Sequence, residues 1–231
     1  MTKWARREQS RSFVPHRARE VSSVAKRAAH LISWSSVMSV SQCAACKATV
    51  PQYDTIHTGS DEHSDRLLCT ACFNREMAKH AGIDNFEQTK FDPMHLSDAS
   101  GNVHQFRFRS LLFGDKLSLE AFDATSENQP SGYRFQILGD AEADQFVLLG
   151  RLIEKMRRLL AVVHVRDGDL GLQIVDETIR GRIEWDGDEH SRMPCVVVDG
   201  RRVEWDELGR MLMTFEGWQF KLELRDPSDE I

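Results

Sequence analysis

The sequence predicts an α+β protein: a small cysteine-rich module followed by a larger domain of mainly antiparallel strands and one long helix. Three observations predict this fold. Two Cys-x-x-Cys pairs lie near the start of the chain, short runs of alternating apolar and polar residues dominate the second half, and one long run has apolar residues at helical spacing. We expect three segments, namely a leader over residues 1–37, the cysteine module over 38–90 and the larger domain over 91–231.

The leader is basic and rich in serine. It holds eight basic and two acidic side chains, whereas residues 38–231 hold 22 basic and 34 acidic ones. Three interpretations stay open: a disordered leader or a translation start assigned too early, with Met38 as the natural start; an organelle transit peptide; or a nucleic-acid-binding arm. The acidic remainder argues against general nucleic-acid affinity, because phosphate contacts need clustered lysine and arginine.

The two cysteine pairs are Cys43 with Cys46 and Cys69 with Cys72. Each pair places two thiols across a tight turn, and together they offer the four thiolates that a tetrahedral zinc ion takes. No apolar run near the N-terminus is typical of a secretory signal, so we expect a cytoplasmic protein with metal ligands rather than disulfides. The prediction is one structural zinc ion, which supplies folding free energy that so small a module lacks.

A helix is predicted directly after the second cysteine pair, with Gly82 as its stop. Its first turn would hold the last two ligands, where the positive end of the helix dipole favours thiolates. A first cysteine turn, a hairpin over Val50–Leu68 and ligands at a helix start together resemble the treble-clef zinc finger, over residues 41–82. This resemblance implies the fold and the four cysteine ligands but assigns no activity.

Two functional variants of such a finger remain as alternatives. A nuclease of the HNH type needs an Asp-His pair, which is missing here although four residues offer suitable side chains: Asp54, His57, His63 and Asp65. A DNA-binding finger needs a basic face, for which four other residues are candidates: Lys47, Arg66, Arg75 and Lys79.

The larger domain begins with alternating strands. Val103–Leu112 and Lys116–Phe122 are predicted to form a hairpin across a Gly-Asp turn, and Tyr133–Ile137 is predicted as a third strand. Phe106 and Phe108 alternate with two arginines, which is typical of a core strand. Stacking of RNA bases on the two rings is the alternative.

A long helix is predicted over residues 142–164, with an apolar stripe that should cover one face of the sheet. Its opposite face carries Arg151, Lys155 and Arg158, which we interpret as a solvated basic row rather than a phosphate or partner site.

The last third repeats the strand pattern. We expect a strand over Leu172–Trp185 broken near Gly181, a hairpin over Pro194–Val203 with an Asp-Gly turn, and a short helix over Trp205–Phe215. Trp218–Arg225 alternates apolar and polar residues, which predicts a final half-buried strand.

Candidate catalytic chemistry is sparse. The sequence has no Gly-rich phosphate loop, no Gly-x-Ser-x-Gly elbow and no His-Glu-x-x-His motif. A hydrolase or nuclease would need carboxylates that converge in a cleft, for which four are candidates: Glu184, Asp186, Glu207 and Glu216. Cys195 lies in an apolar run and is interpreted as a small core residue. No run approaches the roughly 18 apolar residues of a membrane span.

From Met38 onward the order of finger, strand pair and long helix, with the closing segments Trp-Asp-Glu-Leu-Gly-Arg-Met-Leu and Glu-Gly-Trp-Gln-Phe, resembles a family of uncharacterised bacterial proteins. The resemblance implies a bacterial, cytosolic protein with a single zinc ion and adds no catalytic residue. The hypothesis is a non-enzymatic interaction or adaptor protein with a protein partner, nucleic acid being less favoured and a membrane excluded. The alternatives are a metal-dependent nuclease or other hydrolase, and a DNA-binding protein.

Overall fold

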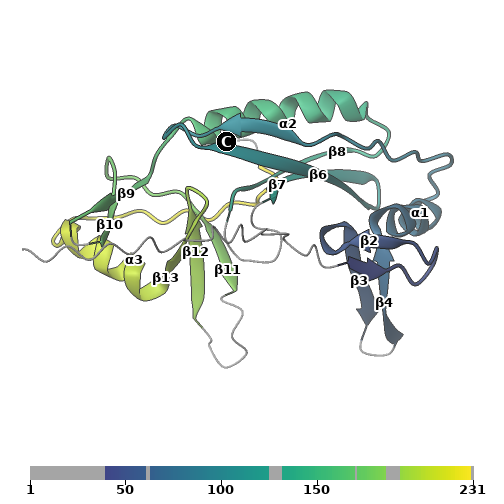
Figure 1. Ribbon diagram of the computed structural model, residues 1–231, viewed down its shortest axis with the longest axis horizontal. Helices are drawn as coiled ribbons and strands as arrows, with labels where there is room; N and C mark the ends of the chain where they lie inside the picture. Colours follow the sequence, from purple (N-terminus) through teal and green to yellow (C-terminus); the bar gives the residue numbers. More distant parts are fainter. Residues whose placement is uncertain (1–39, 61–62, 125–131, 170, 186–192, 230–231) are drawn as a thin grey trace, which may run out of the picture. The chain divides into compact units, whose positions relative to one another are not determined.

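The computed structural model describes residues 40–60, 63–124, 132–169, 171–185 and 193–229, without the side chains of residues 59, 60 and 63–65. Within these ranges helices and strands are mixed, and the strands pair antiparallel, as the sequence predicts (Figure 1). The three α-helices of the described part are α1 (Thr70–Ala81), α2 (Gln145–Leu160) and α3 (Trp205–Leu212). The residues of the leader lie outside the described residues.

A four-stranded sheet forms the centre of the described part, with strand order β5-β6-β7-β8. Its strands are β5 (Met94–Ser97), β6 (Val103–Phe113), β7 (Lys116–Asp123) and β8 (Arg134–Asp140). The predicted hairpin is confirmed, since Phe113 pairs with Lys116 across a two-residue turn whose Gly114 has a φ of 59°. This positive φ favours glycine.

Helix α2 covers one face of this sheet (Figure 1). Asp144 caps its start by accepting a hydrogen bond from the Phe146 amide at 2.8 Å. Its buried stripe, Leu148, Leu152, Met156 and Leu160, packs in one cluster with the inward side chains of the strands. The predicted long helix is therefore confirmed, with shorter bounds.

Smaller sheets flank the centre. The cysteine module contains β1 (Val40–Gln42) with β2 (Thr49–Pro51), and β3 (Thr55–Ser60) with β4 (His63–Cys69). The last third contains β9 (Val165–Gly168) with β10 (Gly171–Ile174), and the sheet β11 (Arg182–Trp185), β12 (Pro194–Val198) and β13 (Arg201–Glu204). The predicted strand 172–185 is thus two strands in two different sheets.

The predicted turn between β12 and β13 is confirmed. Asp199 and Gly200 both have positive φ values, 49° and 72°, as a two-residue hairpin turn of this twist requires. A separate apolar cluster lies around this hairpin and α3, with Val196, Val203 and Met211 buried in it.

Two expectations are wrong. Lys155 is not part of a solvated row, because it is 4% exposed and its ammonium group donates to backbone carbonyls. Residues 218–225 form no strand and pair with no other described residues. Within the described part, no helix combines the length and apolar character needed to cross a bilayer.

Candidate metal centre

Four cysteines come together from two turns of the chain. Cys43 and Cys46 lie in the turn that joins β1 to β2, which is closed by the Cys43 amide bonded to the Ala48 carbonyl at 3.0 Å. Cys69 ends β4 and is the residue before α1, and Cys72 lies in the first turn of that helix. The predicted helix stop is confirmed, since Gly82 ends α1 with a φ of 69°.

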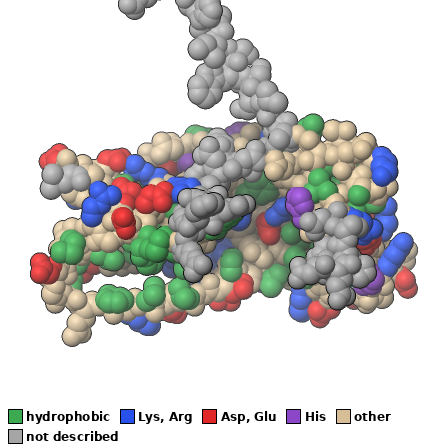
Figure 2. All heavy atoms as spheres, turned by 90° about the horizontal axis from the view of Figure 1, so that it is seen from below, with side chains coloured by type: hydrophobic (Ala, Val, Ile, Leu, Met, Phe, Trp, Pro, Cys, Tyr) green, Lys and Arg blue, Asp and Glu red, His purple; other side chains and the backbone are tan. Residues whose placement is uncertain are grey.

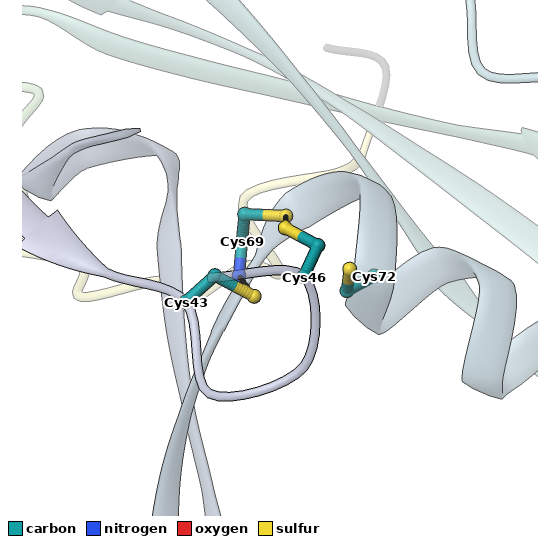
Figure 3. Close-up of side chains that lie close together, drawn as sticks. All are labelled: Cys43, Cys46, Cys69 and Cys72. Carbon is teal, nitrogen blue, oxygen red and sulfur yellow. Dashed lines mark hydrogen bonds between the residues drawn. The ribbon is translucent and has the colours of Figure 1, made fainter. Parts of the chain in front are cut away.

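The four sulfur atoms lie within 4.8 Å of one another and could hold a metal ion (Figure 3). A tetrahedral ion with metal–sulfur bonds of about 2.3 Å needs sulfur atoms about 3.8 Å apart. The Cys46 and Cys69 Sγ atoms are 3.8 Å apart. Three of the four cysteines are buried and Cys46 is exposed. The side chains therefore fit a four-thiolate ion in both number and spacing.

The pKa values of the cysteine thiols also favour binding of a cation. Burial raises the pKa of the Cys43 thiol, but backbone amides led by that of Cys69, at 3.2 Å from the sulfur, outweigh it and bring this pKa to about 6. Burial and the neighbouring thiols raise the pKa of Cys72 to about 12, and burial also raises that of Cys69. Without a cation, repulsion between neighbouring thiolates prevents all four thiols from ionising. A divalent cation that binds the thiolates compensates this repulsion.

The cysteine module is tied to the central sheet by Asn74, which follows Cys72 by two residues and is 1% exposed. Its amide nitrogen donates to the Ser110 carbonyl at 2.9 Å, and its amide oxygen accepts from the Leu112 amide at 2.9 Å. Strand β5 pairs with β6 only as far as Phe106. Asn74 therefore takes the place of a strand partner on the edge of β6 beyond that point.

A second tie involves Tyr53 in the 3-10 helix η1 (Gln52–Asp54). The Arg107 guanidinium carbon lies 4.7 Å from the centroid of the Tyr53 ring, and Arg109 donates to the Tyr53 carbonyl at 3.2 Å. The Tyr53 ring also packs on Phe122 of β7, with 5.6 Å between centroids. The two arginines of β6 thus contact the module on the face away from α2.

Phe106 is fully buried in the core under α2, and Phe108 packs against the same cluster. This confirms the interpretation of β6 as a core strand, and the fully buried Phe106 ring is not available for base stacking.

The other candidates among the described residues of the module do not belong to the cysteine cluster. Arg66 forms an ion pair with Glu76 at 2.8 Å, and three of the basic candidates are exposed: Lys47, Arg75 and Lys79. His57 is exposed and Asp54 is half-buried. The side chains of His63 and Asp65 lie outside the described residues.

Among the described residues, the candidate carboxylates of the last third belong to no metal-binding group. The cysteine cluster is the one group of three or more ligand-type side chains found among the described residues. Glu184 is bonded to Arg182 and lies 3.7 Å from Arg134. Asp186 lies outside the described residues. Cys195 is fully buried, and burial raises the pKa of its thiol, as expected for a core residue.

The sequence reasoning missed Asn74 and Tyr53. A signal for Asn74 was present, because a polar residue stands between buried positions on the inward face of the predicted helix, where it needs a partner. Nothing local distinguishes Tyr53.

Fold and site together define a protein of mixed helices and antiparallel strands with a four-cysteine centre that lies against the four-stranded sheet. Three family models match the chain in succession, each described as a domain of unknown function: DUF7685 over residues 42–84, DUF7686 over 87–161 and DUF7713 over 164–229. The first match contains all four cysteines, the second spans β5 to α2 and the third begins just before β9. Searches of curated proteins and of solved structures found no match.

Proposed function

We propose that this chain is a bacterial, cytoplasmic interaction protein without enzymatic activity, in which one zinc ion bound by Cys43, Cys46, Cys69 and Cys72 holds a structural finger in place. The observation that carries the proposal is the spacing of four thiols suited to one tetrahedral ion. Four protein ligands fill the coordination of zinc, so no position remains for a water or a substrate, which is the pattern of structural sites.

We assign zinc rather than calcium or magnesium because of the donor set. Four soft thiolates in a tetrahedral arrangement select zinc or iron, while calcium and magnesium need oxygen ligands. The treble-clef assignment rests on the order of a cysteine turn after β1, the β3–β4 hairpin and a second cysteine pair at the start of α1.

A structural role for the finger is supported by what its side chains already contact. Asn74 and Tyr53 are engaged with β6, and Arg66 with Glu76, so these groups serve the fold rather than a ligand. A finger that reads DNA needs its basic side chains available on one face.

A protein partner is supported by apolar side chains that the described residues leave at the surface. Ile183 and Trp185 on β11 are 56% and 60% exposed. In the view from below, Figure 2 shows hydrophobic side chains in groups between charged ones. Exposed apolar patches rimmed by polar residues favour protein contacts, and the acidic charge of residues 38–231 disfavours phosphates.

The experiment compares the natural chain with Cys69→Ser and with Cys195→Ala, which changes a buried cysteine outside the cluster. We expect one zinc per chain by elemental analysis in the natural protein and in Cys195→Ala, and none in Cys69→Ser. Crosslinked pull-downs with the two zinc-bound forms should recover one specific protein. Iron in place of zinc would overturn the metal assignment, and recovery of no specific protein would overturn the interaction role.

A further inference from the structure

Residues 218–225 have the alternation of a strand but lie exposed. On one side of the segment, Trp218, Phe220, Leu222 and Leu224 are 61%, 90%, 75% and 71% exposed. On the other side, Glu223 forms ion pairs with Lys221 at 3.4 Å and with Arg225 at 2.5 Å. Neighbours two positions apart share a side only in extended chain, so the segment already has the conformation of a strand.

The segment is held at both ends. The Trp218 amide donates to the Phe215 carbonyl at 2.9 Å, and Lys155 donates to the carbonyls of Pro227 and Asp229, both at 2.7 Å. Between these ends, the backbone of residues 219–225 forms no hydrogen bond with other described residues. Such a row of unpaired amides and carbonyls is a ready template for another strand.

We propose that this row pairs with the same segment of a second copy of the chain, as two antiparallel strands related by a two-fold axis at Leu222. In this register Lys221 lies directly opposite Glu223 of the second copy, and Glu223 lies opposite Lys221 of the second copy. Two opposite-charge pairs therefore form across the strands, each of the kind that stabilises antiparallel pairing.

The charges also reject the neighbouring registers that keep the apolar sides together. An axis at residue 221 places Lys221 opposite Lys221 of the second copy. An axis at residue 223 places Glu223 opposite itself and Lys221 opposite Arg225. Like charges directly opposite each other are destabilising. The charge pattern of the segment therefore favours the register centred on Leu222 over these two registers.

The apolar side fits the same arrangement. Phe220 lies opposite Leu224 of the second copy, and Leu222 lies opposite its own counterpart, so eight exposed apolar side chains meet along one face. A two-fold contact of this kind uses the same patch on both copies and closes on itself, which fits a segment complementary to itself. The ribbon is short, and we expect a dimer that dissociates on dilution.

Charge reversal in the full chain tests the pairing by sedimentation over a concentration series. We expect the natural protein to approach twice its mass of 26.4 kDa as concentration rises. Lys221→Glu or Glu223→Lys should each weaken dimerisation at least tenfold. The double variant should restore it, and an equimolar mixture of the two single variants should form a mixed dimer, because each mixed pair is again of opposite charge.

Crosslinking tests the register. Opposite Cα atoms of an antiparallel pair lie about 4.5–5.5 Å apart, within the span of a disulfide. Leu222→Cys should therefore give a crosslinked dimer under mild oxidation. The matched control Phe220→Cys should not, because its counterpart is four residues along the strand, about 13 Å away. A natural protein that stays monomeric, a dimer unaffected by charge reversal, or equal crosslinking of both variants would overturn the proposal.

Discussion

Strand β6 and residues 218–225 have the same pattern of alternating aromatic and charged side chains, but they end in opposite environments. In β6, Phe106 is fully buried and the alternate arginines contact Tyr53. In residues 218–225, Phe220 is 90% exposed. Alternation therefore predicts an extended backbone in both places, and it does not predict which one has partners.

The partners of β6 explain the difference. Strand β7 follows after a two-residue turn, so pairing closes a very short loop at little cost in chain entropy. Asn74 then covers the part of the other edge that β5 leaves open. Residues 218–225 follow a helical segment, and no described strand adjoins them in the chain.

The largest expected effect is the difference in stability between the alanine variants of Phe106 and Phe220. Phe106→Ala should lower the free energy of unfolding by about 3–5 kcal/mol, because it empties a filled core position. Phe220→Ala should change it by less than about 0.5 kcal/mol at low protein concentration, since the ring touches mainly water. Denaturant unfolding measures both. Equal losses would contradict the contrast between these segments.

Asn74→Ala tests the contribution of the hydrogen bonds between Asn74 and the edge of β6. It should lower the free energy of unfolding by about 2–3 kcal/mol, because it leaves the Leu112 amide and the Ser110 carbonyl buried without partners. The control is Gln88→Ala, which removes one hydrogen bond to the same asparagine and should cost less than about 1 kcal/mol. If the two variants unfold alike, Asn74 does not act as a strand partner.

Lys155→Met tests the anchor beyond the exposed segment. The variant keeps most of the apolar stem and loses hydrogen bonds to three carbonyls, so unfolding should become easier by about 1–2 kcal/mol. Limited proteolysis should cut the chain near residue 226 faster. Arg158→Met, on an exposed position of α2, should change neither measurement.

The smallest effect concerns the turn that begins β6. Burial raises the pKa of Asp98, but hydrogen bonds from Asn102 and His104 outweigh this and hold it below the ordinary 3.8. Ionised Asp98 thus stabilises the fold at neutral pH, and this contribution is lost as the pH falls from about 4 towards its folded pKa. Asp98→Asn should lose about 1 kcal/mol at pH 7 and show a flatter decline below pH 4 in acid unfolding. Exposed Asp84→Asn should follow the natural curve.

Much of this architecture was predictable from local pattern. The Cys-x-x-Cys spacing predicted a cysteine cluster, Gly82 predicted the end of α1, and the Gly114 and Asp199-Gly200 turns predicted two hairpins. These features depend on residues close together in the chain, where sequence spacing fixes geometry. The division at residue 91 into module and larger domain stays a prediction.

What could not be predicted depends on contacts between distant residues. Lys155 had the helical position of a surface residue, but the carbonyls it bonds lie up to 74 residues away. Asn74 meets β6 across 38 residues. The spacing of neighbouring residues does not predict such pairings. The prediction of a final strand was wrong for the same reason, because alternation does not indicate which strand would pair with it.

Asn74 of the cysteine module covers the edge of β6, and we propose that a zinc ion bound by the four cysteines holds it there. Amide hydrogen exchange of Leu112, with zinc bound and after its removal by a chelator, tests this claim most directly. We expect the Leu112 amide to exchange at least tenfold faster without zinc, while that of Leu119 in the middle of β7 keeps its protection. The same exchange rate for Leu112 in both states would contradict the claim.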